Sequence, residues 1–180
     1  MQQGPKRRIV EAFRGVGKSW MAAAYTLWLL RNDPQKKIMV VSASKVRADD
    51  FAQFCLRLIR EMPLLQCLDP DRDEQRSASN RFDVRPAIPD QSASLKSVGV
   101  FGQLTGSRAD LILAEDTEVP NTSWTVSMRE KLISCVGEFN AIPRQKRAFT
   151  TSCACAAMTA GSGRPGIQRT RPNTATVSRR

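Results

Sequence analysis

The sequence contains no histidine. Without histidine, Cys153 and Cys155 lack the partner set of a zinc site, and we interpret this pair as incidental. The five cysteines are an odd number without the spacing of a disulfide framework, which favours a reducing cytosol over a secreted environment.

Long hydrophobic runs are also missing. The apolar stretch "MAAAYTLWLL" at 21–30 falls well short of the roughly 18 residues of a membrane span. The residues before it do not read as a signal peptide. We therefore expect no membrane association.

Acidic residues are absent from 143–180, although eight basic residues lie there. The formal charge of the whole chain is +11, so residues 1–142 carry +3, the difference between +11 and +8. Because the body is only mildly basic, charge alone is weak evidence for DNA binding. The basic residues of this tail are Arg144, Lys146, Arg147, Arg164, Arg169, Arg171, Arg179 and Arg180.

The same tail has no period of 2 or 3.6 and is rich in Ala, Arg, Ser, Thr, Gly and Pro. It cannot bury enough apolar area to offset the entropy of ordering, so we expect 143–180 to be disordered and 1–142 to form the domain. A basic nucleic-acid-binding tail is one interpretation. We favour another, in which the segment is not the sequence with which the fold evolved, as at a frameshifted end.

The first informative motif is "EAFRGVGKSW" at 11–20. It ends like a phosphate-binding loop, although Ala12 stands where the pattern G-x-x-x-x-G-K-[ST] has its first glycine. Alanine can take that place if its backbone keeps an ordinary extended conformation. Gly15 and Gly17 supply the permissive backbone. Lys18 and Ser19 are the residues that reach the β/γ-phosphates and Mg²⁺.

The surroundings favour a true P-loop. "RRIVEAF" at 7–13 predicts a strand, and "KSWMAAAYTLWLLR" at 18–31 predicts a helix. We expect the apolar face of this helix at Met21, Tyr25, Trp28 and Leu29. The plainer alternative is a glycine-rich turn before an ordinary core helix.

The remaining pattern alternates strands and helices. A strand is expected at 38–41, a helix at about 45–61 ended by Pro63, an exposed loop at 69–80, extended segments at 81–88 and 94–102, a strand at 110–116 and a helix after "PNTSW" at 120–124. This order predicts an α/β fold with a mostly parallel sheet and covering helices.

Two acids end the strand "DLILAED". Glu115 and Asp116 would lie at the carboxyl edge of the sheet, where ligands of open α/β folds bind. Mg²⁺ would relieve the repulsion between adjacent carboxylates. The alternative is a strand that merely ends in exposed acids.

Two arginines are further candidates. Arg14 lies inside the loop, beside the expected γ-phosphate, and its alternative is a solvated loop arginine. Arg108 precedes the acidic strand, and could act on the nucleotide of a neighbouring subunit or simply position its loop. A guanidinium on the transferring phosphoryl group can increase the rate by about 10³–10⁵.

Together these residues resemble the ATPase domain of the large terminase subunits of tailed bacteriophages, the DNA maturase B type of the short-tailed phages in particular. The resemblance spans about 4–139 and includes "RRIVEAFRGVGKS", "KKIMVVSASKVRADDF", "SLKSVGVFGQLTGSRADLILAEDTEVPN" and "REKL…EF". It implies a P-loop NTPase fold of the RecA-like (ASCE) type, with ATP and Mg²⁺ as cofactors. The variant first glycine is typical of that family.

The resemblance also implies roles for the residues. Arg14, Gly15, Val16, Gly17, Lys18 and Ser19 would bind nucleotide, with Arg14 as a sensor or arginine finger. Glu115 would help Ser19 hold Mg²⁺, and Asp116 would be the catalytic carboxylate. The family usually has Asp and then Glu here, so the division of roles stays open, with Glu118 as a fallback.

The implied activity is ATP hydrolysis coupled to translocation of double-stranded DNA into a procapsid, in the host bacterial cytoplasm. The implied partners are DNA, the portal or procapsid, a small terminase subunit and further copies in a ring. The family's upstream adenine-contacting segment, the strand with its coupling motif after Ile142 and the nuclease domain are not apparent. We therefore expect an incomplete sheet, truncated at both ends. An inactive fragment that binds nucleotide or nothing, and another P-loop NTPase such as a helicase-like ATPase or a small-molecule kinase, are the alternatives.

Overall fold

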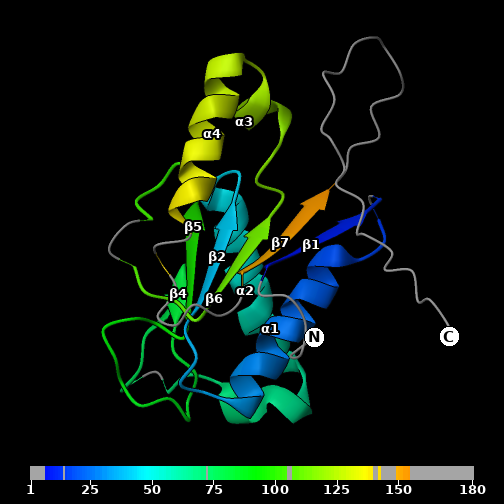
Figure 1. The fold of residues 1–180 in the computed structure, drawn as a ribbon. Helices are drawn as coiled ribbons and strands as arrows, with labels where there is room; N and C mark the ends of the chain where they lie inside the picture. The colour runs from blue at the N-terminus through cyan, green and yellow to red at the C-terminus, as the bar shows by residue number, and fades with distance from the viewer. Residues whose placement is uncertain are drawn as a thin grey trace, which may run out of the picture.

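The computed structural model of the protein describes residues 7–13, 15–71, 73–104, 107–139, 142 and 149–154. Its strands form a single sheet in the order β1-β7-β6-β2-β5-β4-β3 (Figure 1). The strands are β1 (Arg7–Ala12), β2 (Ile38–Ser42), β3 (Ser77–Ala78), β4 (Arg81–Phe82), β5 (Leu95–Gly99), β6 (Leu111–Glu115) and β7 (Phe149–Ala154). The helices are α1 (Lys18–Asn32), α2 (Lys45–Glu61), the 3-10 helix η1 (Pro63–Leu68), α3 (Pro120–Ser123) and α4 (Val126–Glu138).

The sheet is mostly parallel, as predicted. The five strands from β1 to β5 in the sheet order pair in parallel, and only β4 and β3 pair antiparallel at the far edge. Parallel strands bring their carboxyl ends to one edge, where α3 and α4 also lie (Figure 1). The predicted α/β class is confirmed.

Helices cover both faces of the sheet. Along β2, Ile38 and Val40 belong to the hydrophobic cluster shared with α1, α2 and η1, whereas Met39 and Val41 belong to the cluster shared with α4. This alternation follows from the period of two of a strand. Because all five residues of β2 are buried, both of its faces are covered, as in the centre of an α/β sheet.

The predicted bounds of α2 agree with the structure. Ser44 caps the helix, since its hydroxyl accepts a hydrogen bond from the backbone N–H of Arg47 at 3.3 Å. Pro63 follows the last residues of the helix and opens η1. Local signals at both ends therefore fix this element.

The predicted buried face of α1 is only partly correct: Leu29 is buried and Tyr25 packs against the core, but the other two residues are exposed. Met21 is 70% exposed and Trp28 is 44% exposed. Beside Leu29, the helix packs through Ala23, Leu27 and Leu30. Both stripes have the same helical spacing in a segment that is apolar nearly all round, so the periodicity could not choose between them.

The tail prediction is wrong for residues 149–154. They form β7, which pairs in parallel with β1 on one side and β6 on the other. The gap expected in the sheet after Ile142 is therefore filled. The rest of the tail, 143–148 and 155–180, lies outside the described residues.

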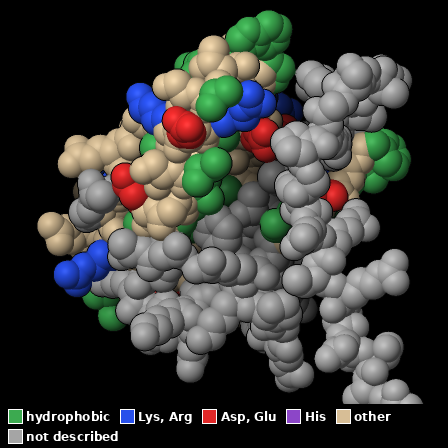
Figure 2. All heavy atoms as spheres, turned by 45° about the horizontal axis from the view of Figure 1, so that its top comes forward, with side chains coloured by type: hydrophobic (Ala, Val, Ile, Leu, Met, Phe, Trp, Pro, Cys, Tyr) green, Lys and Arg blue, Asp and Glu red, His purple; other side chains and the backbone are tan. Residues whose placement is uncertain are grey.

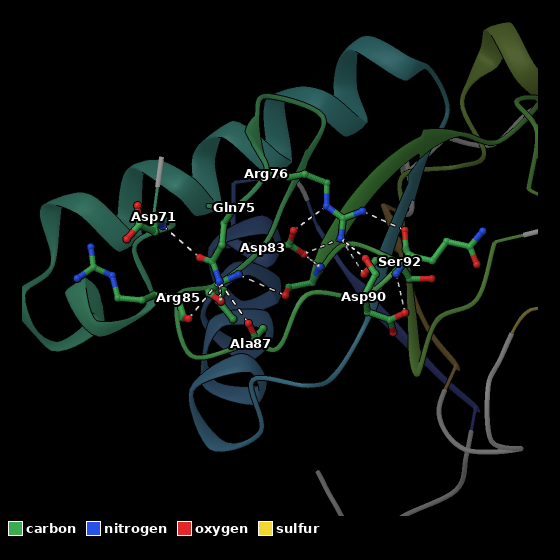
Figure 3. Close-up of polar contacts among 11 residues, drawn as sticks. Asp71, Gln75, Arg76, Asp83, Arg85, Ala87, Asp90 and Ser92 are labelled. Atoms are coloured by element: carbon green, nitrogen blue, oxygen red, sulfur yellow. Dashed lines mark hydrogen bonds and ion pairs between the residues drawn. The ribbon is translucent and has the colours of Figure 1, made fainter. Parts of the chain in front are cut away.

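The segment predicted as an exposed loop is anchored by one arginine. The Arg76 guanidinium forms an ion pair with Asp83 at 2.6 Å and donates hydrogen bonds to the carbonyl oxygens of Asp90, Gln91 and Ser92 (Figure 3). Asp83 is buried and also accepts from the backbone N–H of Ser94 at 3.0 Å. These contacts fold the chain between β3 and β5 around Arg76.

Candidate nucleotide site

The loop between β1 and α1 is held in shape by its glycines. Gly15 has φ +86° and Gly17 has φ +83°, the left-handed region that favours glycine. A Cβ atom at either position would meet no atom within 4 Å. The backbone conformation, not the available space, therefore requires glycine at both positions. Arg14 lies outside the described residues.

The amino end of α1 presents free backbone donors. The backbone bond from Met21 N to Gly17 O, 3.0 Å long, starts the helix, so the N–H groups of the residues before Met21 have no partner within it. The first turn of α1 contains no acid. Such an end attracts anions through its N–H groups and its positive dipole, and phosphate is the natural ligand.

Lys18 closes the loop. Its Nζ donates a hydrogen bond of 3.3 Å to the carbonyl oxygen of Ala12, the last residue of β1. The bond spans the loop from its first residue to the start of the helix, and the lysine is half-buried. An ammonium group held there is near any anion that the loop N–H groups would bind.

Glu115 stands at the carboxyl end of β6. In the register of the sheet it lies between Ser42 of β2 and Ser152 of β7, and it is 9% exposed. Burial raises the pKa of its carboxyl group above the ordinary value, and the charge of Asp116 adds to the rise. A hydrogen bond from the Ser19 side chain and the charge of Lys18 act in the opposite direction on this pKa.

The loop and the acid therefore meet although their strands are not neighbours. β7 lies between β1 and β6, which sets those two strands about 10 Å apart. The effect of the Ser19 side chain on the pKa of Glu115 indicates that the two residues approach each other across the end of β7. Lys18, Ser19, Glu115 and Asp116, four residues singled out from the sequence, are brought together.

Asp116 has an unusual backbone. Its φ of +44° makes it the one residue other than glycine with positive φ among the described residues. Aspartate tolerates the left-handed region better than most residues, at some cost in energy. Conformations of this kind cluster at functional sites, where the surrounding structure maintains them.

Arg108 is not part of this site. The backbones of Lys37 and Asp110 hydrogen-bond to each other at 2.7 Å just before β2 and β6 begin. Arg108 precedes this point, so it lies at the amino end of β6, opposite Glu115, and it is exposed. Glu118 is also exposed, but follows β6 on the same side as Glu115.

Two residues near the site carry no clear signal in the sequence. Ser42 is the register partner of Glu115 and is buried. Cys55, on α2, is buried, and the pKa of its thiol is raised by burial and then by the negative charge of Glu115. Only the topology of the sheet and the packing of α2 place these side chains beside the carboxylate.

The donor set fits a magnesium ion that arrives with a nucleotide. Across the described part of the chain, no group of three or more Asp, Glu, Cys or His side chains could hold a metal ion. Mg²⁺ typically binds through one or two carboxylates and substrate phosphates while keeping several waters. Ser19 and Glu115 match that need, and two adjacent carboxylates would gain from a cation.

The helices described here include none with both the length and the apolarity to cross a membrane.

Acidic and basic side chains lie beside one another on the face toward α3 and α4, without a patch of one sign among the coloured residues of Figure 2. This face thus adds no electrostatic argument for a polyanion partner.

The fold has counterparts among solved structures. The N-terminal domain of the DNA packaging ATPase from bacteriophage phi29 superposes with a TM-score of 0.56 at 14% identity, covering 86% of this chain and 75% of that one. The large terminase ATPase domain of Thermus phage P74-26, in a point-mutant form, gives a TM-score of 0.49 at 11% identity, with 84% and 60% covered. The first likeness, with the phosphate loop between β1 and α1, identifies the fold as that of a P-loop NTPase.

The sequence comparison matches a smaller share of this chain than the phi29 structure does, at a higher identity. Over 137 residues the chain is 51% identical to the large terminase subunit of Enterobacteria phage T3, which covers 76% of this chain and 23% of that protein. The chain therefore belongs to the phage terminase large subunits, as the sequence predicted, through a segment that spans about a quarter of the relative's length. No protein-family model matches the chain.

Proposed function

We propose that this chain is an ATPase segment of a phage DNA-packaging motor, which hydrolyses ATP to translocate double-stranded DNA into a procapsid. The observation that carries the proposal is the approach of the Ser19 hydroxyl, at the phosphate loop, to the Glu115 carboxyl at the end of β6, where it lowers the pKa of that carboxyl. The name of the T3 relative supports the packaging role. The proposed place of action is the host bacterial cytoplasm.

Each site residue has a proposed part. The N–H groups of residues 15–19 bind the phosphate chain, and Lys18 leaves the Ala12 carbonyl to contact the terminal phosphates. Ser19 and Glu115 hold Mg²⁺, which neutralises charge on the phosphate oxygens. Asp116 orients the attacking water and accepts its proton.

Arg14 and Arg108 also have proposed roles. Arg14, inside the loop, is the proposed finger for the nucleotide of its own chain. Arg108 lies on the opposite edge of the sheet from Glu115, so a catalytic role for it requires a nucleotide on a neighbouring copy. The proposed partners are further copies in a ring, double-stranded DNA, the portal or procapsid and a small terminase subunit.

A second candidate is nucleotide binding without turnover. It is favoured by the short span of the match, since 23% of the T3 protein is covered and the remaining portion of such a protein can supply groups needed for hydrolysis. The two candidates agree on the binding residues. They differ in whether phosphate is released.

The test combines binding and turnover on the full chain. Calorimetry with Mg-ATP should show binding, and phosphate release should increase when double-stranded DNA is added. Lys18→Ala should abolish binding. Lys36→Ala is the matched control, because Lys36 pairs with Asp33 at 3.1 Å beyond the far end of α1, about 22 Å along the helix axis.

The outcomes separate the candidates. Binding that survives Lys18→Ala unchanged would show that the phosphate loop is not the site. Binding by the wild-type chain without phosphate release, with or without DNA, would favour the second candidate. Turnover that ignores DNA would contradict the packaging role while leaving the ATPase intact.

A further inference from the structure

Three apolar side chains flank the phosphate loop and are exposed. Phe13 is 73% exposed, Val16 is 47% exposed and Trp20 is 61% exposed. Single exposed apolar side chains are common on protein surfaces, but a group of them beside one site indicates a contact surface. Their position around a phosphate site raises the question of what they cover.

Trp20 differs from the other two because its ring is held in place. The Trp20 and Phe54 rings meet edge to face, with centroids 4.6 Å apart and planes at 79°. Phe54 itself packs against the core cluster beneath α1 and α2. The indole is therefore oriented by the protein and still presents most of its surface to solvent.

The position of Trp20 in the first turn of α1 sets its indole next to the proposed phosphate site. Its N–H precedes the Met21–Gly17 bond that starts α1, so it belongs to the free donors that would bind phosphate oxygens. A side chain attached at that point lies beside whatever extends from the bound phosphates. In a nucleotide, that extension is the sugar and the base.

We propose that Trp20 is the stacking surface for the base of the nucleotide, an inference that rests on the proposed function. A flat, oriented and exposed indole suits the π-face of a base. Stacking of this kind accepts any base, so it sets affinity for nucleotides over inorganic polyphosphates. It does not choose adenine over guanine.

The test compares ligands with and without a base on the full chain. Dissociation constants for Mg-ATP, Mg-GTP and Mg-tripolyphosphate are measured for the wild type, Trp20→Ala and Trp20→Phe. Trp28→Ala is the matched control, since Trp28 is the same side chain two turns further along α1, 44% exposed and stacked on Tyr25. Nucleotide quenching of tryptophan fluorescence is followed in parallel.

Trp20→Ala should weaken binding of both nucleotides about 5- to 150-fold, the range expected for loss of one stacked base, and leave tripolyphosphate binding unchanged. Trp20→Phe should retain most of the affinity and lose most of the fluorescence quenching, and Trp28→Ala should resemble the wild type. Equal losses for nucleotide and tripolyphosphate would show that Trp20 only supports the loop, and unchanged nucleotide binding would also overturn the inference. If the wild-type chain binds tripolyphosphate and ATP equally, base stacking is refuted but the proposed function is not. If it binds neither ligand, both are refuted.

Discussion

The Ser19 hydroxyl approaches the Glu115 carboxyl across the end of a strand to which neither belongs, and hydrogen bonding between them acts on the pKa of Glu115. The bond favours the ionised carboxylate, whereas burial of Glu115 disfavours it more strongly and raises its pKa. The nucleotide-free site thus holds an acid in surroundings that resist its ionisation. Such an arrangement favours ligand binding at the expense of the stability of the empty protein.

Glu115→Gln should therefore stabilise the nucleotide-free chain at neutral pH. Glutamine keeps an oxygen that can accept from Ser19 but carries no buried charge. Because the pKa of Glu115 is raised on folding, its ionisation removes stability as the pH rises from the ordinary glutamate value, about 4.3, through the raised value. Urea unfolding of both proteins between about pH 4 and pH 8 should show a difference in stability that grows with pH.

Glu130→Gln provides the control for this effect, because Glu130 is exposed on α4. It should show no such growth with pH. The added stability of Glu115→Gln should also be accompanied by a smaller rise in melting temperature when Mg-ATP is added, since ligand stabilisation follows affinity. If the difference in stability between the wild type and Glu115→Gln stays constant across the whole pH range, Glu115 is not a buried acid with a raised pKa.

Substitutions of Asp116 should separate its backbone from its chemistry. Asp116→Asn should keep the turn, since asparagine also tolerates positive φ, and should leave Mg-ATP binding nearly intact while removing hydrolysis. Asp116→Val should unfold more easily by about 1–2 kcal/mol, because a β-branched residue is strained at φ +44°. Urea unfolding and phosphate release measure the two effects. Full turnover by Asp116→Asn would move the catalytic role to Glu115 or Glu118.

Four glycine-to-alanine substitutions should have different effects. Gly15→Ala and Gly17→Ala should each cost about 1–2 kcal/mol through positive φ alone. Gly99→Ala should distort the start of α2, since its Cβ would lie 2.9 Å from the backbone nitrogen of Lys45. Gly137→Ala, in α4 with open space around the added methyl, should stabilise by about 0.4–1 kcal/mol. Chemical denaturation ranks the four, and a neutral Gly99→Ala would show that α2 does not pack as described.

Removal of the Arg76 side chain should loosen the segment before β5. Arg76→Ala leaves the buried Asp83 carboxylate without its ion partner, and loss of one partner of a buried pair costs about 3 kcal/mol. The exposed Arg57–Glu61 pair on α2 is the control, and Arg57→Ala should change stability little. Hydrogen exchange should locate the loss of protection in residues 77–95. Equal effects of the two substitutions would contradict the anchoring role of Arg76.

Truncation tests the position of β7. A chain that ends at residue 154 keeps every described strand, whereas one that ends at residue 142 exposes the facing edges of β1 and β6. The shorter chain should aggregate or fail to show cooperative unfolding, because unpaired edges in a parallel sheet leave backbone groups unsatisfied. Circular dichroism and size-exclusion chromatography would compare the two chains. A cooperative, monomeric shorter chain would show that β7 is not needed for the sheet.

The elements predicted well from the sequence have local causes. α2 begins at a capping serine and ends before a proline, and both signals act within a few residues. The phosphate loop has its glycines, lysine and serine in sequence. Glu115 is the last residue of a strand whose apolar run predicts it without distant contacts. For these residues, nearest-neighbour chemistry determines the conformation.

What the sequence did not reveal depends on distant partners. β7 consists of "FTTSCA", which has little apolar periodicity, and its conformation follows from two neighbours, one of them contributed by the first residues described. Which face of α1 is buried depends on how the helix packs against the sheet. The separation of Arg108 from Glu115 depends on strand direction, since the two residues lie at opposite ends of β6.

The insertion of β7 between β1 and β6 also dictates an order of events during synthesis. Arg7 pairs with Phe149, so β1 leaves the ribosome 142 residues before its neighbour in the described sheet, the difference between 149 and 7. At about 5–20 residues per second, that delay is roughly 7–28 s. During this interval β2, β5 and β6 can already associate, while β1 and the glycine loop wait without a strand beside them. Within the described sheet, the nucleotide site is therefore among the last features that a nascent chain can assemble, and a ribosome that stalls before residue 149 would leave it unmade.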